Sequence, residues 1–318
     1  MLFIVSKLFI VSNKKKVETM SNKESTPLTF MAVHAHPDDE VFGTGGIFVR
    51  LADEGVRTVL VTATMGEEGE IVDPDLDQAA REEMFPRLAE VRHQELLASV
   101  AALHIQELRL LHFRDSGMAG RSSNDHPQSF HRAVFDEAVK KVVALIRELK
   151  PQVIVTYDAF GSYGHPDHIQ AQRVTNAAFD AAAEPRCFPD LGLPAWQVSK
   201  LYYTALPRSF MEQLMEEGRR SGVAGPWDNP EMNAAVMGTA DELITTRVDV
   251  RSYLNQKLTA ARAHKTQIAP DNFIFTMPEA QREQFFGYEY YVLARQAIVP
   301  HTGQREQDLF DDIASRAL

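Results

Sequence analysis

The amino-acid sequence predicts an α/β fold, with a mostly parallel sheet and helices on both of its faces. Three observations lead to this prediction. Short apolar runs rich in β-branched residues alternate with longer segments whose apolar residues recur at helical spacing. The runs are continuously apolar, as in strands that are buried on both faces. The two most distinctive polar clusters each follow directly after such a run, where sites form in open α/β sheets.

The first half of the chain alternates regularly between strand and helix. The expected elements, in order, are a strand at 28–33, a helix at 45–56, a strand at 57–64, a loop at 65–78, a helix at 79–102, a strand at 107–113, a helix at 132–149 and a strand at 151–158. The second half is less regular, with strands expected at 199–207 and 242–250 and a helix at 250–267. The simplest interpretation is one domain with an elaborated C-terminal part.

The N-terminal segment differs in composition from the rest. Its apolar part is short, is interrupted by Lys7, and is followed by three consecutive lysines at 14–16. This pattern fits neither a signal peptide nor a membrane span. We therefore expect residues 1–25 to form a disordered extension and residues 26–318 to form a single domain.

Charge and cysteine content exclude several classes of function. The 318-residue chain has 33 Lys and Arg against 44 Asp and Glu, a formal net charge of −11. An acidic chain without a basic run is a poor nucleic-acid binder, because phosphate neutralisation supplies most of that affinity. The single cysteine, Cys187, excludes an internal disulfide and a cysteine-rich zinc finger. We expect a cytoplasmic protein that binds neither nucleic acid nor membrane.

Two loops carry most of the potential metal ligands. They read “HAHPDDE” (34–40), after the first expected strand, and “GSYGHPDHIQ” (161–170), after the fourth. Each contains His-Pro-Asp, in which the proline keeps the preceding histidine in extended backbone and starts the following turn. Taken alone, either loop is also compatible with a structural role, since acidic residues favour helix N-termini. Their joint occurrence at two strand ends favours a site.

The chemistry of these residues indicates a catalytic metal. Two histidines and one carboxylate, with a fourth position left to water, form a typical catalytic zinc site. A neighbouring carboxylate such as Asp38 can act as general base on that water, and a spare imidazole such as His165 can stabilise developing charge. His34 and His36 fall on the same face of the strand, so spacing alone leaves open which of them is the ligand.

“AHPDDE” followed by “GHPDH” resembles the PIG-L/LmbE-like family of zinc-dependent N-deacetylases. Within the family, the sequence is most similar to the mycothiol-biosynthesis deacetylases and the mycothiol-conjugate amidases. The resemblance covers residues 28–267, and the supporting stretches are “GEEGE” (66–70), “FRDSGM” (113–118), “TYDAFGSYGHPDHIQAQRV” (156–174) and “RAHKTQI” (262–268). It implies an LmbE-like, Rossmann-like fold.

The resemblance also implies roles for individual residues. It makes His36, Asp39 and His168 the metal ligands and Asp38 the general base, and it leaves His34 as a structural neighbour. Residues expected around the tetrahedral intermediate are His165 and Tyr163, with the Asp167 carboxylate orienting His165. Substrate contacts are implied at Arg92, Asp115 and His264. Helix spacing equally fits a salt bridge between Arg92 and Glu95.

The implied activity is hydrolysis of an amide in an N-acetylglucosaminyl compound, with zinc or ferrous iron as cofactor. The partner is then a small amino-sugar or thiol-conjugate molecule, and homo-oligomerisation is left open. Residues 119–131 and the tail from Pro270 do not distinguish a deacetylase from a thiol-conjugate amidase. A remoter alternative is a non-catalytic nucleotide- or sugar-phosphate-binding module, suggested by “GTGG” (43–46) at a helix start. Because the third glycine of a dinucleotide fingerprint is absent, we interpret these glycines as close helix–sheet packing.

Overall fold

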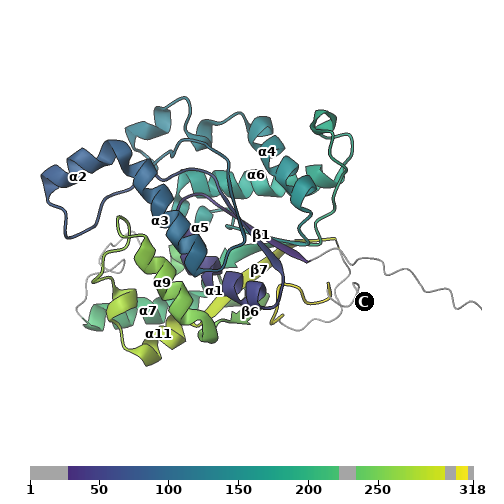
Figure 1. Cartoon of the computed structure of the whole chain (residues 1–318). Coiled ribbons are helices and arrows are strands. Elements are labelled where there is room, and N and C mark those ends of the chain that lie inside the picture. The colour runs from purple at the N-terminus through teal and green to yellow at the C-terminus, as the bar shows by residue number, and fades with distance from the viewer. Residues whose placement is uncertain (1–27, 222–233, 298–305, 314–318) are drawn as a thin grey trace, which may run out of the picture.

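The computed structural model describes residues 28–221, 234–297 and 306–313, and it has a seven-stranded sheet between two layers of helices (Figure 1). The expected N-terminal extension, residues 1–25, lies outside the described residues. In the described part of the chain, no helix has the length and hydropathy of a membrane span.

The sheet confirms the predicted, mostly parallel architecture. Its strands are β1 (Thr29–His34), β2 (Arg57–Thr62), β3 (Glu107–Leu110), β4 (Val153–Thr156), β5 (Lys200–Ala205), β6 (Thr246–Asp249) and β7 (Tyr288–Gln296). They are arranged in the order β3-β2-β1-β4-β5-β7-β6, in which the first five are parallel and β7 is antiparallel to both of its neighbours. The strand order reverses between β1 and β4, and such a switch point is where open α/β sheets bind their ligands.

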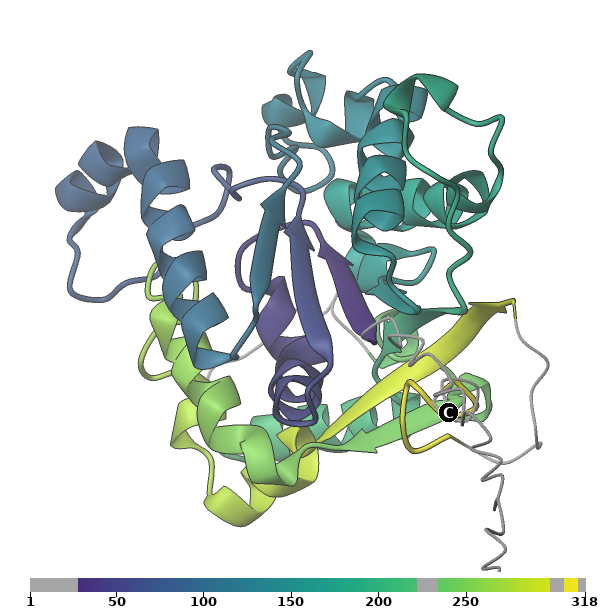
Figure 2. The ribbon, with the colours of Figure 1, turned by 45° about the vertical axis from the view of Figure 1, so that its right-hand side comes forward.

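Helices cover both faces of the sheet (Figures 1 and 2). They are α1 (Asp39–Asp53), α2 (Gln78–Met84), α3 (Leu88–Ala102), α4 (Phe135–Leu149), α5 (Gly161–Gly164), α6 (Pro166–Ala183), α7 (Arg208–Ser221), α8 (Ala234–Met237), α9 (Leu254–Ala263), α10 (Phe273–Thr276) and α11 (Glu279–Phe286). Residues of α1, α3 and α9 form one core with Phe30 and Ala32 of β1, and residues of α4 and α6 form the other with Met31 and Val33. The alternation along β1 explains why this strand is continuously apolar.

Differences from the sequence prediction that bear on packing occur in three elements. The helix expected at 79–102 is divided into α2 and α3 by a 3₁₀ turn that contains Pro86, whose ring disfavours regular helix before it. Helix α1 starts at Asp39, six residues earlier than expected, because packing overrides the low helix propensity of Gly43, Gly45 and Gly46. Strand β7 was not predicted.

The glycines at 43 and 46 are explained by close packing, as the sequence analysis proposed. A Cβ atom on Gly43 would lie 2.9 Å from the Cγ2 atom of Thr204 on β5, and one on Gly46 would lie 2.4 Å from the Cβ atom of Val250. Helix α1 therefore approaches its neighbours too closely for a side chain at these positions. No phosphate-binding role is needed to account for the motif.

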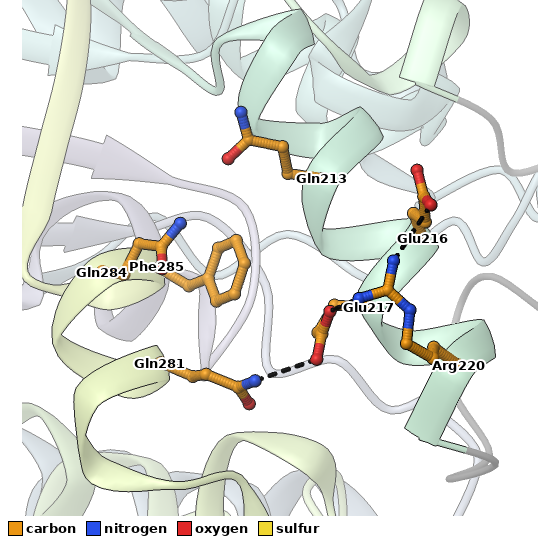
Figure 3. A pocket seen from close by; sticks show the side chains of 7 residues that line it. All are labelled: Gln213, Glu216, Glu217, Arg220, Gln281, Gln284 and Phe285. Atoms are coloured by element: carbon orange, nitrogen blue, oxygen red, sulfur yellow. Dashed lines mark hydrogen bonds and ion pairs between the residues drawn. The ribbon is translucent and has the colours of Figure 1, made fainter.

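A separate cavity of about 280 Å³ lies between α7 and α11 (Figure 3). Gln213 and Glu217 line one side, and Gln281 and Phe285 line the other. Within it, the Gln281 amide donates a hydrogen bond of 3.0 Å to Glu217. None of the residues that line it belongs to the two His-Pro-Asp loops.

The packing of α1 gives a prediction for stability. We expect Gly46→Ala to lower the free energy of unfolding by about 1–3 kcal/mol, because the clash with Val250 outweighs the gain in helix propensity. Gly43→Ala should cost less, since its Cβ atom would lie 2.9 Å from the nearest atom of Thr204, against 2.4 Å from Val250 for Gly46. Urea unfolding of both variants measures this. A Gly46→Ala protein at least as stable as the wild type would contradict the packing explanation.

Candidate metal centre

The two His-Pro-Asp loops meet because β1 and β4 are adjacent parallel strands. His36 follows β1 by two residues, and Asp39 is the first residue of α1. His168 lies in the first turn of α6, which begins at Pro166. The fixed φ of proline suits the first helical position, so the sequence itself defines where this helix starts. The sheet thus brings together residues that are 132 positions apart in the chain.

The potential ligand atoms of three side chains, His36, Asp39 and His168, form a small triangle in this crevice. His36 Nδ1 lies 3.2 Å from His168 Nε2 and 3.4 Å from Asp39 Oδ2. His168 Nε2 lies 3.3 Å from Asp39 Oδ1. Atoms bound at about 2.1 Å to a tetrahedral zinc ion are about 3.4 Å apart. The spacing and the chemistry of these three side chains therefore fit a zinc ion.

Two other groups of buried side chains have donor atoms close enough to consider. One is His36, His165 and His168, and the other is His36, Asp115 and Asp167. In the first group, the Nδ1 atom of His165 already accepts the main-chain N–H of Asp167 at 3.1 Å. In the second group, both carboxylates lie at Nε2 of His36, whereas His168 and Asp39 lie at Nδ1 of the same ring. In the group that includes Asp39, every pair of side chains has donor atoms within 3.4 Å of each other.

The Asp167 carboxylate faces His36 and not His165, the residue for which the family resemblance implied it. We expected it to orient His165, but its Oδ2 atom lies 3.3 Å from His36 Nε2. Asp115, expected to contact substrate, also lies 3.5 Å from this atom and is only 3% exposed. Both carboxylates thus face the ring nitrogen of His36 that points away from His168.

Tyr157, which is not among the residues expected at the site, positions Asp39. Its hydroxyl donates a hydrogen bond of 2.7 Å to Asp39 Oδ2 and accepts one of 2.8 Å from the main-chain N–H of Ala35. Its ring stacks on His168 with 4.1 Å between centroids. The available signal was its place directly after β4, where a side chain faces the crevice.

His34 points away from the triangle. Its Nε2 atom lies 2.8 Å from Thr44 Oγ1, its Nδ1 atom lies 3.3 Å from the hydroxyl of Tyr157, and its side chain is buried. The geometry therefore favours His36 over His34 as the ligand, a choice that the spacing of the residues left open.

Asp38 lies beside the triangle in an unusual conformation. Its φ of 104° is in the left-handed region, which costs about 1–3 kcal/mol for a residue other than glycine. Glu40 Oε2 accepts the main-chain N–H of Asp38 at 2.9 Å, and Arg92 donates to Asp38 Oδ2 at 3.1 Å. With 24% of its side chain exposed, against 12% for Asp39, Asp38 is the more accessible of the two.

Arg92 is buried and does not pair with Glu95. Its guanidinium donates to the carbonyl oxygen of Gly66 at 2.6 Å, to that of Pro37 at 2.5 Å and to the Asp38 carboxylate. Glu95 instead accepts hydrogen bonds from Thr266. The exposed helix pair that spacing allowed is therefore not formed.

His264 lies behind Asp38 rather than at an open surface. Its imidazole is 0% exposed and is 2.7 Å from Glu40 Oε1, which also accepts a hydrogen bond from Ser99. We expected this histidine to contact substrate. The structure places it in the interior, where it supports the glutamate that holds the backbone of Asp38.

His165 and Tyr163 border the triangle on the side of α5. The rings of His36 and His165 are 4.5 Å apart, and the Tyr163 hydroxyl is 3.5 Å from His168 Nε2. A Cβ atom on Gly161 would lie 2.8 Å from that of His168, and Gly161 also has a positive φ. This position therefore requires glycine, which lets the loop that carries Tyr163 pack closely on α6.

The electrostatics of the crevice favour a bound cation. Burial lowers the pKa of His168 to about 4 and that of His165 to about 3, so both are neutral at pH 7. Burial opposes charge on His36 as well, but the carboxylates around it raise its pKa well above the ordinary value. The negative charge that stabilises a proton there would equally stabilise a divalent cation.

The pKa of Asp38 is also shifted. Burial, with the charge of Asp39 beside it, raises the pKa of Asp38 to about 6, although Arg92 acts in the opposite direction. A carboxylate with a pKa near the working pH is well suited to accept and return a proton.

The chain is similar in sequence to known deacetylases. Residues 31–179 match the family model described as PIG-L: GlcNAc-PI de-N-acetylase. The chain is 43% identical over 270 residues to the 1D-myo-inositol 2-acetamido-2-deoxy-alpha-D-glucopyranoside deacetylase of Geodermatophilus obscurus, an alignment that covers 83% of this chain and 91% of that protein.

Solved structures share the fold at low sequence identity. The N,N'-diacetylchitobiose deacetylase of Pyrococcus horikoshii has a TM-score of 0.56 at 19% identity, covering 82% of this chain and 83% of that chain. The 4-carboxy-2-hydroxymuconate hydratase of Pseudomonas putida KT2440 has a TM-score of 0.57 at 16% identity, covering 86% and 99%. Because this fold carries both a deacetylase and a hydratase, the fold alone does not decide the reaction. The extent and identity of the match to the curated deacetylase do decide the family, and the chain belongs to the PIG-L family of GlcNAc-PI de-N-acetylases.

Proposed function

We propose that this protein is a metal-dependent N-deacetylase that removes the acetyl group from the amide nitrogen of an N-acetylglucosaminyl compound. The observation that carries the proposal is the triangle of His36, Asp39 and His168 with the accessible carboxylate of Asp38 beside it. Membership of a deacetylase family supports the same reaction.

The three residues of the triangle would hold the metal, for which we propose zinc, with ferrous iron as the alternative. When bound, such an ion lowers the pKa of a coordinated water and polarises the amide carbonyl. Tyr157, through its hydrogen bond to Asp39, fixes one ligand. The carboxylates facing His36 Nε2 fix another, as is usual for metal-binding histidines.

Asp38 acts as the general base. Its carboxylate accepts a proton from the water that attacks the acetamide carbonyl, and Arg92 and Glu40 keep it in the required conformation. The same carboxyl group, once protonated, donates the proton to the leaving nitrogen. The C–N bond then breaks, and acetate and a free amine are released.

His165 stabilises the oxyanion as a neutral hydrogen-bond donor. Because its Nδ1 atom accepts the main-chain N–H of Asp167, its proton is on Nε2, and this N–H is available to the tetrahedral intermediate. A neutral imidazole is a weak acid, which supports Asp38 rather than His165 as the proton donor to the amine. The Tyr163 hydroxyl, close to His168 Nε2, is a second donor to the oxyanion.

For the substrate, we propose an N-acetylglucosaminyl inositol. The name of the relative from Geodermatophilus obscurus specifies such a compound, and 91% of that relative is covered. This supports the deacetylase over the thiol-conjugate amidase, which the sequence left open. Arg92, Asp115 and His264, which the resemblance placed at the sugar, are largely buried in this structure, so we assign them to the support of Asp38 and His36.

A substrate panel tests this assignment. We expect amine release from N-acetylglucosaminyl inositol at least tenfold faster, in kcat/KM, than from N-acetylglucosamine, chitobiose or a thiol-conjugate amide, measured with a fluorogenic amine reagent. Prior removal of metal with a chelator should abolish the reaction, and added zinc should restore it. Faster release from the thiol conjugate would assign the chain to the amidase branch instead.

The general-base role predicts the effect of Asp38→Asn. The amide preserves the shape but cannot accept a proton, so kcat should fall by about 10²–10⁴-fold, while one equivalent of zinc is retained. Steady-state kinetics and metal analysis on the same preparation measure both. Full activity of the Asp38→Asn enzyme would rule out this residue as the base.

The donor role of His165 predicts a graded series. His165→Ala should lower kcat by about 10²–10³-fold, and His165→Gln, which offers an N–H at a similar reach, should recover part of the loss. Circular dichroism checks that both variants are folded. If kcat of His165→Gln were no higher than that of His165→Ala, His165 would not act as an uncharged hydrogen-bond donor.

A further inference from the structure

Two buried carboxylates face Nε2 of His36, the ring nitrogen that points away from His168. Nε2 of this histidine lies 3.3 Å from Asp167 Oδ2 and 3.5 Å from Asp115 Oδ1, while Nδ1 faces His168 and Asp39. A metal-binding histidine needs its second nitrogen fixed, because that contact sets the tautomer and the orientation of the ring. The position of the Asp167 carboxylate therefore determines how His36 presents Nδ1.

Ser116 holds the Asp167 carboxylate by both of its oxygens. Its main-chain N–H donates to Oδ2 at 2.9 Å, and its hydroxyl donates to Oδ1. The Ser116 hydroxyl in turn accepts the main-chain N–H of His131 at 3.0 Å. Ser116 and Asp167 are both 0% exposed, so no water competes from the surface. A continuous path of hydrogen bonds runs from the 116–131 loop to His36.

We propose that Ser116 and Asp167 are positioning residues for the metal ligand His36, and that Asp167 does not serve to orient His165. The inference rests on the proposed metal site. Asp167 reaches His165 only through its main-chain N–H, which donates to Nδ1. That contact survives any change of the Asp167 side chain, whereas the contact to His36 depends on the carboxylate itself.

The same carboxylates are better explained as hydrogen-bond acceptors than as ligands of a second cation. Asp115 accepts main-chain N–H groups of Glu68 at 3.0 Å and of Gly117 at 2.8 Å. Asp167 accepts both donors of Ser116. These donors, together with the contacts to His36 Nε2, satisfy both carboxylates without an ion. We therefore expect one zinc equivalent per chain.

Zinc affinity tests the inference without relying on activity. The full-length chain and its variants are titrated with zinc against a chromophoric chelator. We expect Asp167→Asn to weaken zinc binding by about 10–100-fold, the range typical for residues that orient metal ligands, and Ser116→Ala to weaken it by about 10-fold. Ser116→Thr, which keeps the hydroxyl, should recover most of the affinity.

Ser129→Ala provides the matched control. Ser129 lies in the same loop and is equally buried, but its hydroxyl donates to the carbonyl oxygen of Asn124 at 3.3 Å and not to Asp167. The zinc affinity of the Ser129→Ala variant should equal that of the wild type. Thermal unfolding in the presence of a chelator shows whether any variant has lost its fold.

The possible failures are distinguishable. If Asp167→Asn and Ser116→Ala bound zinc like the wild type, whatever their kcat, neither residue would position His36 for the metal and the inference would be wrong. A second tight zinc equivalent in the wild type that Asp167→Asn removes would make the carboxylates ligands. If the wild type bound no zinc, the proposed function would itself fail.

Discussion

Two imidazole nitrogens and one carboxylate approach one another within 3.2–3.4 Å in a buried crevice, and much of the surrounding structure maintains this arrangement. Buried ionisable groups are costly unless they are paired or bind a metal. Here the cost is offset by the opposite charges within the group and by fixed donors such as the hydroxyl of Tyr157. A divalent cation at the centre would compensate the remaining negative charge. The close contact therefore fits the proposed reaction, and the surrounding fold offsets its energetic cost.

Three parts of the structure hold the side chains of the triangle and Asp38 in place. The adjacent parallel strands β1 and β4 deliver the two loops to one edge of the sheet, and α1 and α6 begin within these loops. Behind the first loop, a buried network built on Arg92 and Glu40 holds Asp38 in its left-handed conformation. Beside the second, Ser116 fixes Asp167. Helix α1 can approach so closely because Gly43 and Gly46 leave no side chain in the way. The two loops that carry the potential metal ligands thus also contain the starts of the helices α1 and α6, which pack on the sheet.

Much of the fold could be predicted from local pattern, because buried parallel strands and amphipathic helices have distinct periodicities. Strand β7 was missed since its antiparallel pairing with β5 and β6 depends on residues distant in sequence. The two His-Pro-Asp loops identified the crevice, but contacts that require three-dimensional placement could not be read from spacing. Asp167, expected at His165, faces His36, and His264, expected at the substrate, is buried against Glu40. Tyr157 was missed because an aromatic residue after an apolar strand resembles ordinary core.

The central claim is that His36, Asp39 and His168 bind one ion while a fourth position remains for water. X-ray absorption spectroscopy of the zinc-loaded protein tests it most directly. The account predicts about one zinc per chain, with four nitrogen or oxygen neighbours near 2.0–2.1 Å and the multiple-scattering signal of two imidazoles. That signal should fall to one imidazole in His168→Ala and persist unchanged in His165→Ala. A signal of three imidazoles that loses one in His165→Ala would show that His165 belongs to the ligand set, contrary to this account.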